Sequence, residues 1–158
     1  MNGLQRLIAK LGTTKAFAGV GQALTRVDER LLRRTNGRFG VGSSIGLRTL
    51  LLTSTGRRSG QPRQVPLLYV ERDGAFIVIG SNWGGENHPA WSANLIDQPQ
   101  ATATVRGRTL PVHARLLTGD ERQTTWDAVA AYWPAYNTYA TRAANREIRV
   151  FRLEVSPA

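Results

Sequence analysis

Residues 50–70 constrain the fold of this chain more than any other stretch, because two strand-like runs flank a short segment rich in turn residues. The first run, residues 50–53, is apolar and β-branched, and the second, residues 65–70, is mostly aliphatic and aromatic; both compositions are typical of strands. Between them, residues 55–62 include two glycines, which tolerate positive φ angles, and a proline, which does not fit a central strand. The pattern predicts an antiparallel β-hairpin.

The turn of this hairpin concentrates positive charge. Arg57 and Arg58 lie at its tip and Arg63 follows just after it, so guanidinium groups and glycine N–H groups converge on one region. Both kinds of donor bind phosphate and carboxylate groups. The sequence therefore indicates an anion site here, with a solvated basic hairpin as the alternative interpretation.

The rest of the chain predicts further hairpins and few helices. Turns at Asp73-Gly74 and Gly107-Arg108 each separate two strand-like runs. Thr118 and Glu121 have the spacing of a capping box at the start of a helix that Pro134 should break. Six strands joined in this way fit a small antiparallel barrel better than a doubly wound sheet. Strands are predicted at residues 50–53, 65–70, 75–81, 100–106, 109–117 and 148–155, and helices at 4–11, 13–36, 89–96 and 118–133, with a further helical piece after Pro134.

The N-terminal part of the chain predicts an amphipathic helix. Apolar residues recur there at intervals of three and four, which places them on one face. We expect this stripe to pack on the barrel, because it lacks an interfacial tryptophan; the alternative is a basic interfacial helix attracted to anionic lipid. Residues 1–47 are therefore predicted to be a helical segment and linker, and residues 48–158 the barrel domain. The stripe consists of Phe17, Val20, Leu24, Val27 and Leu31.

Charge and composition narrow the classes of function. The formal net charge is +10, and residues 1–63 hold twelve Lys or Arg against two acidic residues, an asymmetry that suggests contact with an anionic partner. Nucleic acid is not expected, because the aromatic residues lie mostly outside this basic part. The chain has no cysteine and only His88 and His113, so we expect no metal site.

The apolar runs of the sequence are too short for a membrane span or a secretory signal. A cytoplasmic protein is expected, peripheral at the membrane if the amphipathic helix at residues 13–36 is interfacial. No feature of the sequence fixes an oligomeric state.

Three stretches together carry a resemblance: TSTGRRSGQPRQVPLLYV, then AFIVIGSNWGGENHPAW, then NLIDQPQATATVRGRTLPVHAR. In order and spacing they resemble the deazaflavin-dependent nitroreductase family, over nearly all of residues 50–155. The resemblance implies an α+β fold, mainly β, built on a split β-barrel like that of FMN-binding proteins, preceded by N-terminal helices. It also implies hydride transfer from reduced coenzyme F420 to a quinone, a nitro compound or another conjugated electron-poor acceptor. An F420-binding carrier or sensor without turnover, and an FMN-dependent split-barrel oxidoreductase, are the alternatives.

The same resemblance implies site residues. Ser81 would donate a hydrogen bond to the acceptor oxygen, Tyr136 would reach both cofactor and acceptor and could supply a proton, and Tyr139 would flank it. Relatives commonly have lysine where this chain has Asn82, which is followed here by the bulky Trp83, so one cationic contact is missing. The cofactor-binding residues implied are Arg57, Arg58, Ser59, Arg63, Gln64, Val65, Pro66, Leu67, Leu68, Ile79, Gly80, Ser81, Asn82, Ala90, Trp91, Ser92, Ala93, Asn94 and Tyr136.

Overall fold

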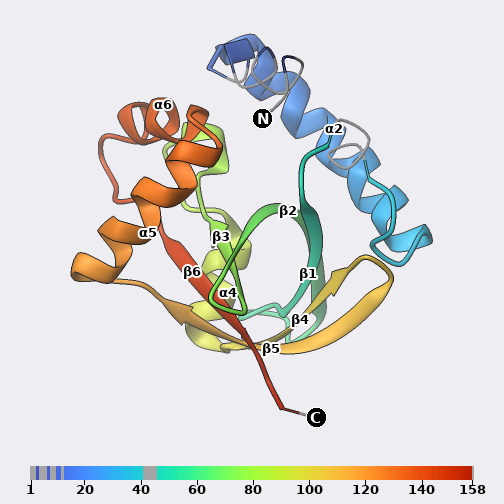
Figure 1. Ribbon diagram of the computed structural model, residues 1–158. Helices are drawn as coiled ribbons and strands as arrows, with labels where there is room; N and C mark the ends of the chain where they lie inside the picture. Colours follow the sequence, from blue (N-terminus) through green and yellow to red (C-terminus); the bar gives the residue numbers. More distant parts are fainter. Residues whose placement is uncertain (1–2, 4–6, 8–9, 12, 41–45, 158) are drawn as a thin grey trace.

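A computed structural model describes residues 3, 7, 10–11, 13–40 and 46–157 of the protein. Six strands form a closed antiparallel barrel in the order β1-β2-β3-β6-β5-β4 (Figure 1). This confirms the α+β barrel that the sequence predicts. The strands are β1 (Thr49–Thr55), β2 (Pro62–Arg72), β3 (Ala75–Ile79), β4 (Gln100–Val105), β5 (Arg108–Leu116) and β6 (Val150–Val155). The helices are α2 (Lys15–Arg34), η1 (Asn82–Gly84), α4 (Ala90–Asp97), α5 (Gly119–Tyr132) and α6 (Ala135–Arg142).

Two apolar clusters hold the barrel and its helices together. One fills the barrel interior, where Leu50, Leu52 and Phe151 are almost wholly buried. The other lies outside the barrel wall, between the strands and the α5–α6 pair. Alternate residues of β2 serve the two clusters, because successive side chains of a strand point to opposite faces: Leu67 and Tyr69 face inward. The α5–α6 pair stands on one side of the barrel and α2 on another (Figure 1).

Two local predictions need correction. The turn between β4 and β5 is Arg106-Gly107 rather than Gly107-Arg108, and both residues have positive φ angles, +49° and +80°. A two-residue hairpin turn of this kind needs positive φ at both central positions, and glycine is favoured at the second. Helix α5 begins after Thr118 as expected, but no side-chain capping bond forms. Glu121 binds the Arg115 guanidinium instead, through two contacts of 2.7 and 2.8 Å.

Helix α2 is present as predicted, but its apolar stripe does not pack on the barrel. Val20, Leu24, Val27 and Leu31 expose 56%, 42%, 51% and 37% of their surface, whereas Leu32, on another face of the helix, is fully buried. The prediction is wrong because helical spacing shows that an apolar stripe exists but not what covers it. The side chain of Phe17 and part of the predicted first helix lie outside the described residues.

The end of α2 is joined to the barrel at the β4–β5 turn. The Asn36 amide donates to the Gly107 carbonyl at 2.9 Å, and the N–H of Arg106 donates to the Gly37 carbonyl at 3.0 Å. The division at residue 47 stays a prediction. Among the described residues, no helix combines the length and apolar character that a membrane crossing needs.

Candidate active site

The hairpin between β1 and β2 ends in a loop defined by its own hydrogen bonds. The N–H of Gly56 donates to the Gln61 carbonyl at 2.8 Å, and the N–H of Gly60 donates to the Gly56 carbonyl at 2.7 Å. The Ser59 hydroxyl accepts from the Gln61 N–H at 3.2 Å and from the Arg63 guanidinium at 3.3 Å. A Cβ at position 56 would lie 2.7 Å from that hydroxyl, so glycine suits the position. The loop is thus shaped by the protein itself.

Three exposed arginines surround this loop. Arg57, Arg58 and Arg63 take part in none of the ion pairs formed by the described residues. The backbone N–H of Arg57 donates to Oδ1 of Asn94 in α4 at 3.1 Å, which ties the hairpin to that helix. Guanidinium groups without a carboxylate partner are available to an anionic ligand, and their planar fork matches phosphate and carboxylate oxygens.

The first part of β2 has a free edge. Strand β2 pairs with β1 along residues 62–68, but its ladder with β3 covers only residues 69–72. One edge of residues 62–68 therefore has no strand partner within the part of the chain that the structure describes. The backbone polar groups on such an edge need other partners, which water or a flat ligand can supply. This edge carries the predicted cofactor residues Arg63, Gln64, Val65, Pro66, Leu67 and Leu68.

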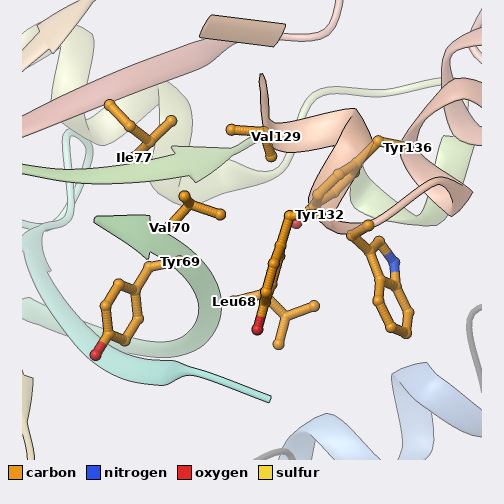
Figure 2. A pocket seen from close by; sticks show the side chains of 8 residues that line it. Leu68, Tyr69, Val70, Ile77, Val129, Tyr132 and Tyr136 are labelled. Atoms are coloured by element: carbon orange, nitrogen blue, oxygen red, sulfur yellow. The ribbon is translucent and has the colours of Figure 1, made fainter. Parts of the chain in front are cut away.

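A hollow of about 210 Å³, open to solvent, lies beside the end of this edge (Figure 2). Strands β2 and β3 form one side of it, and α5 and the start of α6 form the other. Tyr69 contributes from the strand backbone but turns its ring to the far side of β2. Most of this volume is open solvent, and the enclosed part has room for no more than about one water molecule, so a ring would rest at the mouth of the hollow. The lining residues are Leu68, Tyr69, Val70, Ile77, Val129, Tyr132, Trp133 and Tyr136.

After β3 the chain turns through a strained loop. Asn82, Trp83 and Gly84 follow one another with φ angles of +46°, +56° and +77°. Positive φ is uncommon for asparagine and strained for tryptophan. The Asn82 amide donates to the Asn87 carbonyl at 2.9 Å, so the side chain at the position where the resemblance leads one to expect a lysine binds its own loop. Of the predicted cofactor residues here, Ile79 and Gly80 are buried, and Ser81 and Asn82 are half-buried.

Helix α4 is held between the hairpin and the last strand. Asn94 is buried, and its amide also donates to the Ser54 hydroxyl at 3.4 Å. The buried Ser92 hydroxyl donates to the Pro89 carbonyl at 2.8 Å and accepts from Arg149 at 3.0 Å. Both side chains are therefore occupied within the protein. Of the other predicted residues in α4, Trp91 is buried 5.6 Å from the Phe151 ring, Ala93 is half-buried and Ala90 is exposed.

The aromatic residues of α5 and α6 form a connected group. The rings of Tyr136 and Tyr139 lie 6.1 Å apart, and Tyr139 lies 6.0 Å from Trp83. Tyr136 lines the hollow, as does Tyr132, which is not among the site residues that the resemblance implies. Tyr139 is 2% exposed and lies behind Tyr136, outside the lining. Of the three predicted catalytic residues, Tyr136 thus lines the hollow and Ser81 and Tyr139 do not.

Burial sets the acidity of these phenols. It raises the pKa of Tyr136 far above the ordinary phenol value, and the neighbouring Tyr139 and Tyr132 raise it further. Burial also raises the pKa of Tyr139, against a hydrogen bond from Trp133 that lowers it. Tyr136 therefore stays protonated at physiological pH. It is suited to donating a hydrogen bond but is too weak an acid to give up its proton readily.

Comparisons with known proteins find a matching family, similar sequences and similar folds. The model of a family described as F420H(2)-dependent quinone reductase matches residues 24–154. An F420H(2)-dependent quinone reductase of Mycobacterium tuberculosis (strain H37Rv) is 32% identical over 96 residues, which are 61% of this chain and 64% of that protein. The match thus spans less than two thirds of that relative. A second protein of the same strain, named as a putative member, is 34% identical over 56% of this chain and 75% of its own length.

Two solved structures share the fold. An F420-H2-dependent reductase has a TM-score of 0.62 and 35% identity, covering 68% of this chain and 94% of that one. A structure described as a domain-swapped dimer has a TM-score of 0.64 and 33% identity, covering 81% and 96%.

Proposed function

Because this chain belongs to the F420H(2)-dependent quinone reductase family, we propose that it reduces a quinone with electrons from reduced F420. The family is described as F420H(2)-dependent, which confirms the prediction that the cofactor is coenzyme F420. The observation that carries the proposal is the free edge of β2 along residues 62–68, which runs from three exposed arginines to the apolar hollow.

The protein's groups fit such a cofactor. A deazaflavin with a phosphate and carboxylate tail needs cationic donors at one end and a flat, partly apolar surface at the other. Arg57, Arg58 and Arg63 supply the first, and the free edge of β2 supplies the second. When bound there, the reduced deazaflavin supplies a hydride to the acceptor. The protein's part is to bind, to orient and to keep water out.

The acceptor ring is proposed to lie at the mouth of the hollow, against Leu68 and Tyr132. Tyr136, which lines the hollow, orients an acceptor oxygen by donating a hydrogen bond. The half-buried Ser81 hydroxyl lies outside the lining and is a second candidate donor for an acceptor that extends beyond the hollow toward the end of β3. The net proton comes from solvent, because the raised pKa of Tyr136 makes the phenol a poor acid. A nitro compound is the second acceptor class proposed, since it also develops negative charge on oxygen during reduction.

A titration followed by fluorescence tests the cofactor site. We expect the protein to bind F420 in preference to FMN, and Arg57→Ala combined with Arg58→Ala to weaken F420 binding by roughly 100-fold, as two lost charge-assisted contacts would. The matched control is Arg106→Ala with Arg108→Ala, two exposed arginines at the β4–β5 turn. If both double variants weakened F420 binding equally, the cofactor site would not lie at the β1–β2 hairpin.

The same protein, loaded with reduced F420, should then be oxidised by a panel of quinones and nitroaromatic compounds. Rapid oxidation by quinones supports a reductase. Binding of F420 with no oxidation by any acceptor would assign a carrier or sensor instead, and preference for FMN would assign a flavin enzyme.

A second proposal concerns the exposed face of α2, which we infer is a contact for anionic lipid. Val20, Leu24, Val27 and Leu31 form an uncovered apolar stripe, and Arg30 and Arg34 are exposed on the same helix. An apolar stripe beside basic residues is the pattern of a helix that lies in a membrane interface. It would bring the site close to a lipid-soluble quinone.

Sedimentation with vesicles tests this. The protein should bind vesicles containing phosphatidylglycerol and leave vesicles of phosphatidylcholine alone, and Val20→Ser with Val27→Ser should release it. Ile96→Ser, which alters an equally exposed apolar residue on α4, should have no effect. A dimer in solution that the α2 substitutions convert to monomers would assign the stripe to a second copy of the chain.

A further inference from the structure

Arg146 joins the segment after α6 to the loop that follows β3. Its Nε donates to the Gly85 carbonyl at 3.0 Å, and its Nη2 donates to the Ser81 carbonyl at 2.8 Å. Its Nη1 lies 3.3 Å from the Gly80 carbonyl and 3.2 Å from Nδ1 of His88. One guanidinium group thus binds both ends of the loop, across about sixty residues of sequence.

The bound loop is the strained one. Between the two ends that Arg146 holds, Asn82, Trp83 and Gly84 all have positive φ angles. Such angles cost on the order of 1–3 kcal/mol for residues other than glycine, and they persist only where surrounding contacts enforce them. The bonds from Arg146 to the flanking carbonyls provide that enforcement, because a planar fork fixes the spacing and direction of the oxygens it binds.

Arg146 has no carboxylate among these partners. It forms none of the ion pairs found in the described part of the chain, and its contacts are three carbonyls and one histidine nitrogen. For Nδ1 of His88 to accept its bond, the ring must be unprotonated there. Burial and the cations Arg149 and Arg146 lower the pKa of His88, which favours that neutral form.

We propose that Arg146 is a positioning residue, which holds the loop of residues 80–88 in the shape that presents Ser81 and the end of β3 to the cofactor and acceptor. This inference rests on the proposed function for the roles of those residues. Arg146 itself does not line the hollow. It acts by fixing the backbone on both sides of the Ser81-Asn82 turn.

The test compares Arg146→Lys with Arg152→Lys. Arg152 also binds backbone carbonyls, but of the β2–β3 turn, donating to Arg72 at 3.3 Å and to Asp73 at 3.0 Å, and it pairs with Glu154 at 3.1 Å, so it is a control that holds a different turn. A lysine ammonium is a single point and does not span three carbonyls. We expect hydrogen exchange of the peptide covering residues 80–88, measured without cofactor, to rise about tenfold in Arg146→Lys only.

The same two variants should differ in activity. Relative to the unaltered protein, kcat for a quinone should fall roughly 10- to 100-fold in Arg146→Lys and change by no more than about twofold in Arg152→Lys. Guanidinium ion added to Arg146→Ala should restore part of the rate. His88→Ala removes one of the four contacts of Arg146 and should raise hydrogen exchange of residues 80–88 by a smaller factor. This variant provides the test if the Arg146 variants do not fold.

Unchanged loop exchange in Arg146→Lys, or equal changes in both lysine variants, overturns the proposal. That result is distinguishable from a failure of the proposed function. If the unaltered protein binds no F420, the assigned function falls, while the exchange measurement still decides whether Arg146 holds the loop.

Discussion

At the scale of single residues, Gly84 shows how tightly the loop after β3 meets α6. Its φ angle is +77°, and an added Cβ would lie 2.9 Å from Cβ of Arg142 and 3.0 Å from the Tyr139 carbonyl. Neither atom is the far end of a flexible side chain, so the helix would have to move. Gly74, in the β2–β3 turn, has nearly the same φ angle, +73°, but open space around the added Cβ.

We therefore expect Gly84→Ala to lower the free energy of unfolding by about 3 kcal/mol, from the left-handed backbone plus the clash. Gly74→Ala carries only the backbone penalty and should cost about 1 kcal/mol. Urea unfolding of both variants at one temperature measures the difference. Equal losses would show that the clash is relieved without cost and that the loop is softer than its contacts indicate.

At the scale of elements, the hairpin of β1 and β2 was predictable because every local signal agreed. Apolar and β-branched runs, two glycines and a proline all specify two strands and a turn, and the arginines fall at the exposed tip whatever the rest of the fold does. The free edge of β2 was not predictable in this way. It depends on where β3 stops pairing, at Tyr69 and Val78, which is a property of the closed barrel.

The remaining differences have the same cause, since they depend on contacts between distant residues. The stripe of α2 was visible, but its orientation was decided by Leu32 and the bonds from residues 36–37 to the β4–β5 turn. Glu121 could either cap the start of α5 or pair with Arg115, and in the structure it accepts two hydrogen bonds from the Arg115 guanidinium. Arg146 carried no local signal, because its partners lie about sixty residues earlier.

At the scale of the whole molecule, the positive charge is permanent. Nineteen of the 21 basic residues are arginine, and the sequence pI is about 11.3, so the protein keeps a large positive charge from neutral pH to well above it. A field of this sign attracts an anionic cofactor before any contact forms. Attraction of that kind acts on the association rate, whereas direct contacts act on the dissociation rate.

We expect the association rate constant for F420 to fall roughly tenfold when salt rises from about 20 mM to about 500 mM, because the ions screen the field. The dissociation rate should change little. Arg30→Gln with Arg34→Gln, which removes two exposed charges of α2, should lower only the association rate, while Arg57→Ala should raise the dissociation rate. Stopped-flow fluorescence separates the two constants. An association rate constant that does not change with salt would mean that only the hairpin arginines attract the cofactor. The positive charge of the N-terminal part would then bind another anionic partner, such as the lipid surface proposed for α2.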